Sequence, residues 1–204
     1  MSSGRSLPVI QSGGRQGVPP AFDRVGVVGL GGLGGAVAMA VRAAWPAALV
    51  IGVDRSDLVE QAIRSSAVDL GADDPFVLAE AGLVVLAAGR DEQERWLQAL
   101  PDLLTGPAVI TTTRADEGRP DASALPPHLS FVCGHACVAP APAGVVPAGA
   151  ERFAGARWLL SARDGDPASD RLAAFVRALG ATPVFAPESD AAFLSILRPS
   201  AGPR

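Results

Sequence analysis

Short apolar runs alternate along the chain with longer segments in which apolar residues recur at helical spacing. The apolar runs are rich in valine, isoleucine and leucine and cover residues 24–29, 48–54, 82–88 and 108–113, with helical segments starting near residues 33, 57 and 91. Uninterrupted apolar runs are typical of strands that are covered on both faces, and alternation of strands with helices produces parallel sheets. The pattern predicts an α/β fold of the Rossmann type, doubly wound, with a mainly parallel sheet and helices on both faces.

The second half of the chain continues the alternation less regularly. Further apolar runs cover residues 128–135, 157–162 and 182–186, and a helix is expected over about 167–179. The segment GADDP at 71–75 is expected to be a turn, and the Pro/Gly/Ala-rich segment 139–155 an irregular loop. Residues 1–20 are rich in Gly, Ser and Pro and predict a flexible tail, so the domain is expected to cover residues 21–188.

Composition narrows the function classes. The 204 residues carry a formal net charge of −4, which favours neither nucleic acid nor an anionic membrane as a partner. No apolar run reaches the roughly 18 to 20 residues that span a bilayer, and the first residues lack the apolar centre of a signal peptide. We therefore expect a cytoplasmic protein. Cys133 and Cys137 are too few for a zinc site, so we expect reduced thiols and no metal.

A glycine-rich bend follows the first apolar run. Gly29, Gly31 and Gly34 match the pattern G-x-G-x-x-G between a predicted strand and a predicted helix, which is the context that this motif requires in dinucleotide-binding folds. The first glycine allows a tight turn, the second lets a diphosphate approach the backbone, and the third lets the helix pack closely on the strand. The helix start then offers its N–H groups to the phosphates.

An acidic residue follows the second apolar run. Asp54 stands where a carboxylate accepts hydrogen bonds from the adenosine ribose and repels a 2′-phosphate, which favours NAD over NADP. Arg55 leaves NADP open, because a guanidinium can pair with that phosphate or stack on adenine. Two simpler interpretations are a bend without a ligand and, for Asp54, a helix cap or a solvated carboxylate. The predicted cofactor-binding residues are Gly29, Leu30, Gly31, Gly32, Leu33, Gly34, Asp54, Arg55, Ala87 and Ala88.

A second motif makes the prediction more specific. The segment GHACVAPAPAGV at 134–145, followed by FAGARWLL at 153–160, resembles the nucleotide-binding domain of prephenate and arogenate dehydrogenases. In that family the region reads approximately G-H-P-hydrophobic-A-G-[ST]-E-K-S-G-V, followed by F-x-G-x-x-W. The similarity runs from about residue 25 to the end of the chain.

The resemblance implies NAD(P)-linked oxidative decarboxylation of prephenate to 4-hydroxyphenylpyruvate, or of arogenate to tyrosine, within tyrosine biosynthesis. His135 falls at the family's catalytic histidine. A neutral imidazole, with an unperturbed pKa of about 6.5, can accept the proton of the substrate hydroxyl as hydride leaves.

The departures from the family are equally specific. Ala136, Ala141 and Pro142 replace the family's proline, glutamate and lysine, and Arg114 stands at the position of a serine that bonds the substrate hydroxyl. An arginine cannot replace that hydroxyl but can pair with a substrate carboxylate. The simpler interpretations are a solvated loop arginine at 114 and a structural histidine at 135.

Family members also continue into a helical domain that forms the dimer and supplies further substrate-binding residues. Residues 189–204, which include the apolar segment 190–197, are expected to be a short stub of that domain. A homodimer or a completing partner chain is therefore expected. Three functions remain open: a prephenate dehydrogenase-like enzyme, a dinucleotide-binding relative without catalysis, and a dehydrogenase for another small carboxylic acid.

Overall fold

The computed structural model describes residues 19–115, 118–139, 150–161 and 166–186. The predicted tail lies outside this part of the chain except for its last two residues, 19 and 20. The predicted stub at 189–204 and the residues that replace the family's glutamate and lysine, Ala141 and Pro142, also lie outside it.

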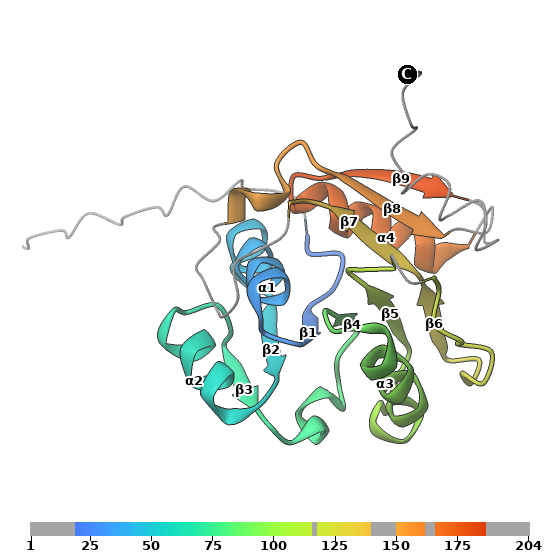
Figure 1. Cartoon of the computed structure of the whole chain (residues 1–204), viewed down its shortest axis with the longest axis horizontal. Helices are drawn as coiled ribbons and strands as arrows, with labels where there is room; N and C mark the ends of the chain where they lie inside the picture. The colour runs from blue at the N-terminus through green and yellow to red at the C-terminus, as the bar shows by residue number, and fades with distance from the viewer. Residues whose placement is uncertain (1–18, 116–117, 140–149, 162–165, 187–204) are drawn as a thin grey trace, which may run out of the picture.

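A six-stranded parallel sheet forms the centre of the molecule, in the order β3-β2-β1-β4-β5-β6 (Figure 1). Its strands are β1 (Arg24–Val28), β2 (Leu49–Val53), β3 (Leu70–Ala72), β4 (Leu83–Leu86), β5 (Ala108–Thr112) and β6 (Leu129–Val132). This is the strand order of a doubly wound dinucleotide-binding fold, in which the order of successive strands across the sheet reverses between β1 and β4. The predicted fold class is confirmed.

Helices cover both faces of this sheet. On one face lie α1 (Gly32–Ala44), α2 (Ser56–Arg64) and α4 (Pro167–Ala178), and on the other lie α3 (Arg90–Leu103) and the short 3-10 helix η1 (Pro75–Leu78). Successive side chains of each strand point to opposite faces of the sheet. Val27 packs in the core of the α1 face and Val28 in the core of the α3 face. Both faces being covered explains why the strands are apolar without interruption.

A smaller sheet of three strands lies beside the main one, in the upper part of Figure 1. It contains β7 (Gly134–Cys137), β8 (Arg157–Ser161) and β9 (Thr182–Ala186), with β7 antiparallel and β9 parallel to β8; the short 3-10 helix η2 (Ala150–Phe153) precedes β8. The expectation of one apolar run at 128–135 is therefore corrected, because the run is divided between two sheets.

The division occurs at Cys133. Its N–H donates to the Ser161 hydroxyl at 2.9 Å, and its carbonyl accepts from the Ser161 N–H at 2.8 Å, so Cys133 pairs with the end of β8. The next residue, Gly134, pairs with the Thr112 hydroxyl at the end of β5. The Gly134 N–H donates to this hydroxyl, and the Gly134 carbonyl accepts from it. A Cβ at Gly134 would lie 2.4 Å from the Thr112 carbonyl oxygen, so only glycine allows this crossing.

The structure also corrects the predicted turn and describes the residues near the start of the predicted domain. The turn predicted at 71–75 begins later, because Gly71 and Ala72 pair with β2 as the last residues of β3. Phe22, near which the domain is predicted to begin, is buried and contacts Phe175 of α4 edge to face, at 6.2 Å between ring centroids. Both cysteines are reduced thiols, Cys133 buried and Cys137 half-buried.

A very close contact between α1 and the end of β1 occurs at Gly34. A Cβ there would lie 1.8 Å from the carbonyl oxygen of Gly29 and 2.9 Å from the side chain of Ala87. No side chain can occupy that space, so α1 approaches β1 only because residue 34 is glycine. Gly31, three residues earlier, has no atom within 4 Å of its Cβ position.

We predict that Gly34→Ala lowers the free energy of unfolding by about 3 kcal/mol, because the methyl group forces α1 away from β1. Thermal unfolding should show a melting temperature lower by roughly 6–12 °C. Gly31→Ala is the matched control and should change the unfolding free energy by about 1 kcal/mol or less. Equal effects of the two substitutions would contradict the packing argument.

Candidate functional site

The carboxyl ends of the parallel strands meet at one edge of the main sheet. Open α/β sheets bind ligands in the crevice at this edge, where the strand order reverses, which here is between β1 and β4. The glycine-rich bend follows β1, Asp54 follows β2, and Ala87 follows β4. The structure therefore brings the predicted cofactor-binding residues to the edge that the fold makes available.

The bend combines a left-handed glycine with an uncapped helix start. Gly29 has a φ of +86°, and its N–H donates to the Val53 carbonyl at 3.0 Å, which joins the bend to β2. Gly31 is the N-cap residue of α1, no side chain caps this helix start, and its first turn contains no acidic residue. The space at the Cβ position of Gly31 and the N–H groups of the first turn of α1 together fit a ligand oxyanion.

Asp54 is hydrogen-bonded to the backbone of the bend. Its Oδ2 accepts from the N–H of Leu30 at 2.6 Å, and its Oδ1 accepts from the N–H of Arg55 at 2.7 Å. Asp54 is not the cap of α2, because Arg55 is the N-cap residue of that helix. A carboxylate oxygen has two lone pairs, so each oxygen of Asp54 can accept a further hydrogen bond from a ribose hydroxyl.

Arg55 presents a guanidinium at the same strand end. Its side chain is 71% exposed, and its Nε lies 2.7 Å from Oδ1 of Asp57. Exposed ion pairs of this kind contribute little and exchange readily with other partners. Arg55 is therefore accessible to a phosphate or to an adenine ring, as the sequence suggested, and its position is compatible with either cofactor.

A cavity of about 260 Å³ lies where β4 and β5 end. It brings together Ala87, Ala88 and Arg114, three of the residues singled out in the sequence. Its lining consists of Ala87, Ala88, Gly89, Arg90, Gln93, Arg114, Ala115 and Gly118. The cavity adjoins the glycine-rich bend, since a Cβ on Gly29 would lie 2.9 Å from the Ala87 carbonyl oxygen.

Gln93 is a member of this lining that the sequence analysis missed. It lies in the first turns of α3 within the acid-rich segment DEQERW, which is typical of a solvated helix start. Gln93 is nevertheless buried, at 2% exposure, and its Nε2 donates to the carbonyl oxygens of Ala88 at 2.8 Å and Arg114 at 3.1 Å. It thus connects the ends of β4 and β5.

His135 lies in β7, next to the same cavity. Its Nδ1 accepts a hydrogen bond from the N–H of Ala115 at 3.0 Å. A neutral imidazole that accepts at Nδ1 carries its proton on Nε2. As placed, His135 therefore presents a hydrogen-bond donor at Nε2, whereas the predicted role of proton acceptor requires an unprotonated nitrogen.

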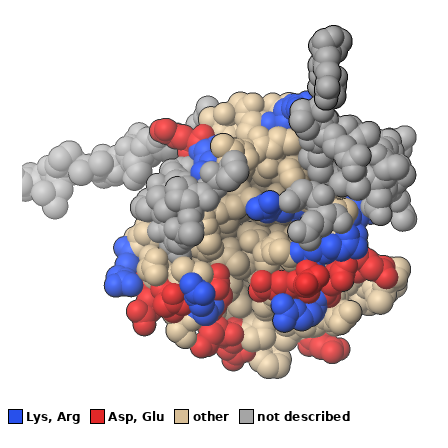
Figure 2. Space-filling model, viewed as in Figure 1, with Lys and Arg blue, Asp and Glu red and all other residues tan. Residues whose placement is uncertain are grey.

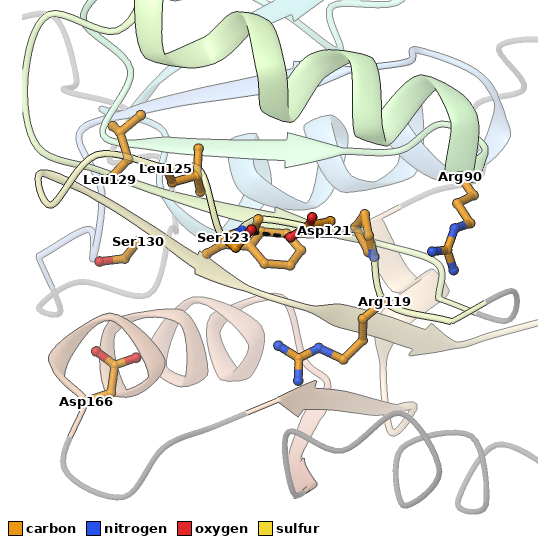
Figure 3. Close-up of a pocket in the computed structure, with 11 residues that line it drawn as sticks. Arg90, Arg119, Asp121, Ser123, Leu125, Leu129, Ser130 and Asp166 are labelled. Carbon is orange, nitrogen blue, oxygen red and sulfur yellow. Dashed lines mark hydrogen bonds between the residues drawn. The ribbon is translucent and has the colours of Figure 1, made fainter.

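A larger cavity of about 710 Å³ lies beside β6 (Figure 3). The carboxylates in its lining are already engaged: Asp166 accepts from the N–H groups of Ala168 and Ser169 at the start of α4, and Asp121 accepts from the N–H of Ser123. Hydrogen bonds from Ser123 lower the pKa of Asp121. None of the predicted site residues contributes to its lining, which consists of Arg90, Arg119, Pro120, Asp121, Ala122, Ser123, Leu125, Leu129, Ser130, Phe131 and Asp166.

The surface charges are mixed. Figure 2 shows acidic and basic side chains side by side on the face in view, and ion pairs join several of them, as in Arg90 with Glu94 on α3. Within the described ranges, no helix is long and apolar enough to cross a membrane, and no group of His, Cys, Asp and Glu side chains could hold a metal ion.

Comparison with solved structures supports the predicted resemblance. Synechocystis arogenate dehydrogenase superposes with a TM-score of 0.71 and 25% sequence identity over 81% of this chain. The predicted resemblance to prephenate and arogenate dehydrogenases is confirmed. The chain spans 60% of the length of the Synechocystis enzyme. No protein-family model matches the sequence, and no curated protein matches it significantly.

More distant structures share the fold. Aquifex aeolicus prephenate dehydrogenase, solved in complex with hydroxyphenyl propionate and NAD+, superposes with a TM-score of 0.70 and 17% identity over 81% of this chain and 60% of its own. Mycobacterium tuberculosis 3-hydroxyisobutyrate dehydrogenase gives a TM-score of 0.65 and 15% identity over 86% of this chain and 58% of its own. The architecture is thus common to several classes of dehydrogenase.

We predict that Asp54→Ala exposes the Leu30 amide to hydrogen exchange and lowers the free energy of unfolding by about 1–3 kcal/mol, because the buried N–H loses its acceptor. Hydrogen exchange measured by NMR, together with urea unfolding, checks this. The control is Asp57→Ala, which removes an exposed carboxylate of α2 and should cost about 1 kcal/mol or less without changing exchange at Leu30. Unchanged exchange at Leu30 in Asp54→Ala would contradict the contact.

Proposed function

We propose that this chain binds a nicotinamide dinucleotide as part of an oxidoreductase similar to prephenate and arogenate dehydrogenases. The observation that carries the proposal is the bend at Gly29–Gly34: an uncapped helix start, an open position at Gly31, and a carboxylate at the end of the neighbouring strand. The NAD+ in the Aquifex complex supports the proposal, since that enzyme shares the fold.

Each part of the dinucleotide has a matching group in the chain. The first turn of α1 would hold the diphosphate, and Asp54 would accept hydrogen bonds from the adenosine ribose. The nicotinamide half then lies on the other side of the reversal point, toward Ala87 and Ala88. A carboxylate at position 54 favours NAD, and the neighbouring Arg55 allows NADP as the second choice.

The proposed reaction is the oxidation of prephenate or arogenate with loss of carbon dioxide. The bound cofactor would supply the hydride acceptor. Arg114, in the lining of the cavity, would pair with a substrate carboxylate, and Nε2 of His135 would donate a hydrogen bond to a substrate oxygen. Proton acceptance by His135 requires that its ring first releases the N–H of Ala115.

A second candidate is a dinucleotide-binding relative that does not catalyse oxidation. The hydrogen bond from Ala115 to Nδ1 of His135 favours it, because Nδ1 is engaged by this N–H and Nε2 carries the proton of the neutral ring, so that neither nitrogen can accept a proton while the contact lasts. Arg114, in place of the family's serine, supports either this candidate or a dehydrogenase for another small carboxylic acid, which Arg114 would recognise by its charge.

We predict that Gly31→Val weakens NADH binding while the protein remains folded. A Cβ at position 31 has no protein atom within 4 Å, and the valine side chain would occupy the space proposed for the diphosphate. Fluorescence or calorimetric titration should show affinity for NADH reduced at least about tenfold, a loss of about 1.4 kcal/mol, with little change in melting temperature. Wild-type protein that binds neither NADH nor NADPH would refute the proposed function.

A turnover assay distinguishes the proposed enzyme from a dinucleotide-binding relative that does not catalyse oxidation. We expect wild-type protein to form NADH from NAD with prephenate or arogenate, and His135→Ala to lose this activity, as followed by nicotinamide absorbance. Arg114→Ala should raise KM for the acid substrate more than it lowers kcat, since it removes a binding contact. NADH binding without turnover of either substrate would establish the second candidate.

A further inference from the structure

Gln93 combines burial with an unused hydrogen-bonding atom. Its Nε2 donates to the carbonyl oxygens of Ala88 and Arg114. Because only the amide nitrogen can donate to two carbonyl groups, these contacts identify the nitrogen, and the other atom of the side-chain amide is the acceptor Oε1. Among the residues that the structure describes, none donates a hydrogen bond to Oε1. Gln93 lines the cavity, so a ligand there, or water, can supply the donor that this acceptor lacks within the protein.

The position of Gln93 indicates what that ligand is. The side chain lines the cavity at the ends of β4 and β5, which lies across the reversal point from Asp54. A dinucleotide with its adenosine ribose at Asp54 and its diphosphate at Gly31 extends its other half toward this cavity. The nicotinamide ring carries a carboxamide, whose NH₂ group is a hydrogen-bond donor and matches a lone acceptor.

We propose that Gln93 is the positioning residue for the nicotinamide ring: its Nε2 holds the ends of β4 and β5 at a fixed separation, and its Oε1 accepts from the nicotinamide carboxamide. This inference rests on the proposed function and adds the residue that orients the reactive ring. Holding the carboxamide fixes the rotation of the ring about its bond to the ribose, and thus which face of the ring meets a substrate near Arg114.

The first test uses wild-type protein and two cofactors. 3-Acetylpyridine adenine dinucleotide keeps the ring and the carbonyl group of NAD+ but lacks the NH₂ donor. Calorimetric titration should show that NAD+ binds about 3- to 10-fold more tightly than this analogue, as expected for one hydrogen bond between uncharged groups. Equal affinities for the two cofactors would overturn the proposal.

The second test uses Gln93→Met, which keeps the length of the side chain and removes both polar groups. The preference for NAD+ over the acetylpyridine analogue should disappear, while the affinity for ADP-ribose, which lacks the nicotinamide ring, should stay within about twofold. Gln98→Met is the matched control, because Gln98 is exposed on the same helix and should leave all three affinities unchanged.

The outcomes separate the two claims. If Gln93→Met weakens ADP-ribose and NAD+ equally, Gln93 has only a structural role and the inference is wrong, whereas the proposed function stands. If wild-type protein binds ADP-ribose but shows no preference among nicotinamide analogues, the inference is again wrong. If wild-type protein binds none of these ligands, the proposed function fails and the inference with it.

Discussion

The structure depends on the direct contact between the backbone of β1 and the start of α1. At Gly34 the helix lies so close to the Gly29 carbonyl that a single methyl group cannot fit. This contact fixes where α1 begins, and the helix start in turn fixes where an oxyanion can bind. Asp54 then joins the bend to β2 through the N–H of Leu30. The core and the candidate site are therefore built from the same few atoms.

Much of this arrangement could be predicted from the sequence, because the responsible interactions are local. The apolar runs identified the strands that are buried on both faces, and the spacing of Gly29, Gly31 and Gly34 predicted the bend. Asp54 was expected beside the bend because an acidic residue at the end of the second strand completes the dinucleotide-binding pattern. Its hydrogen bond to Leu30 was not expected, since a contact between residues 24 positions apart depends on the tertiary structure.

Other features could not be predicted because they are decided by distant partners. The break at Cys133 is invisible in the apolar run around it and arises from hydrogen bonds to Ser161, 28 residues later. Gln93 stands among acidic residues, and only the carbonyl groups of Ala88 and Arg114 show that its side chain is turned inward. The state of His135 likewise depends on the N–H of Ala115, which no motif records.

The hydrogen bonds of Asp54 have a consequence for the thermodynamics of binding. Both carboxylate oxygens are already held by main-chain N–H groups, so the side chain has lost its rotational freedom during folding. A ribose that reaches this carboxylate meets an acceptor that needs no further ordering, which lowers the entropic cost of association. In the proposed function the strand end would thus be a preorganised receptor, whose rigidity is supplied by folding and not by the ligand.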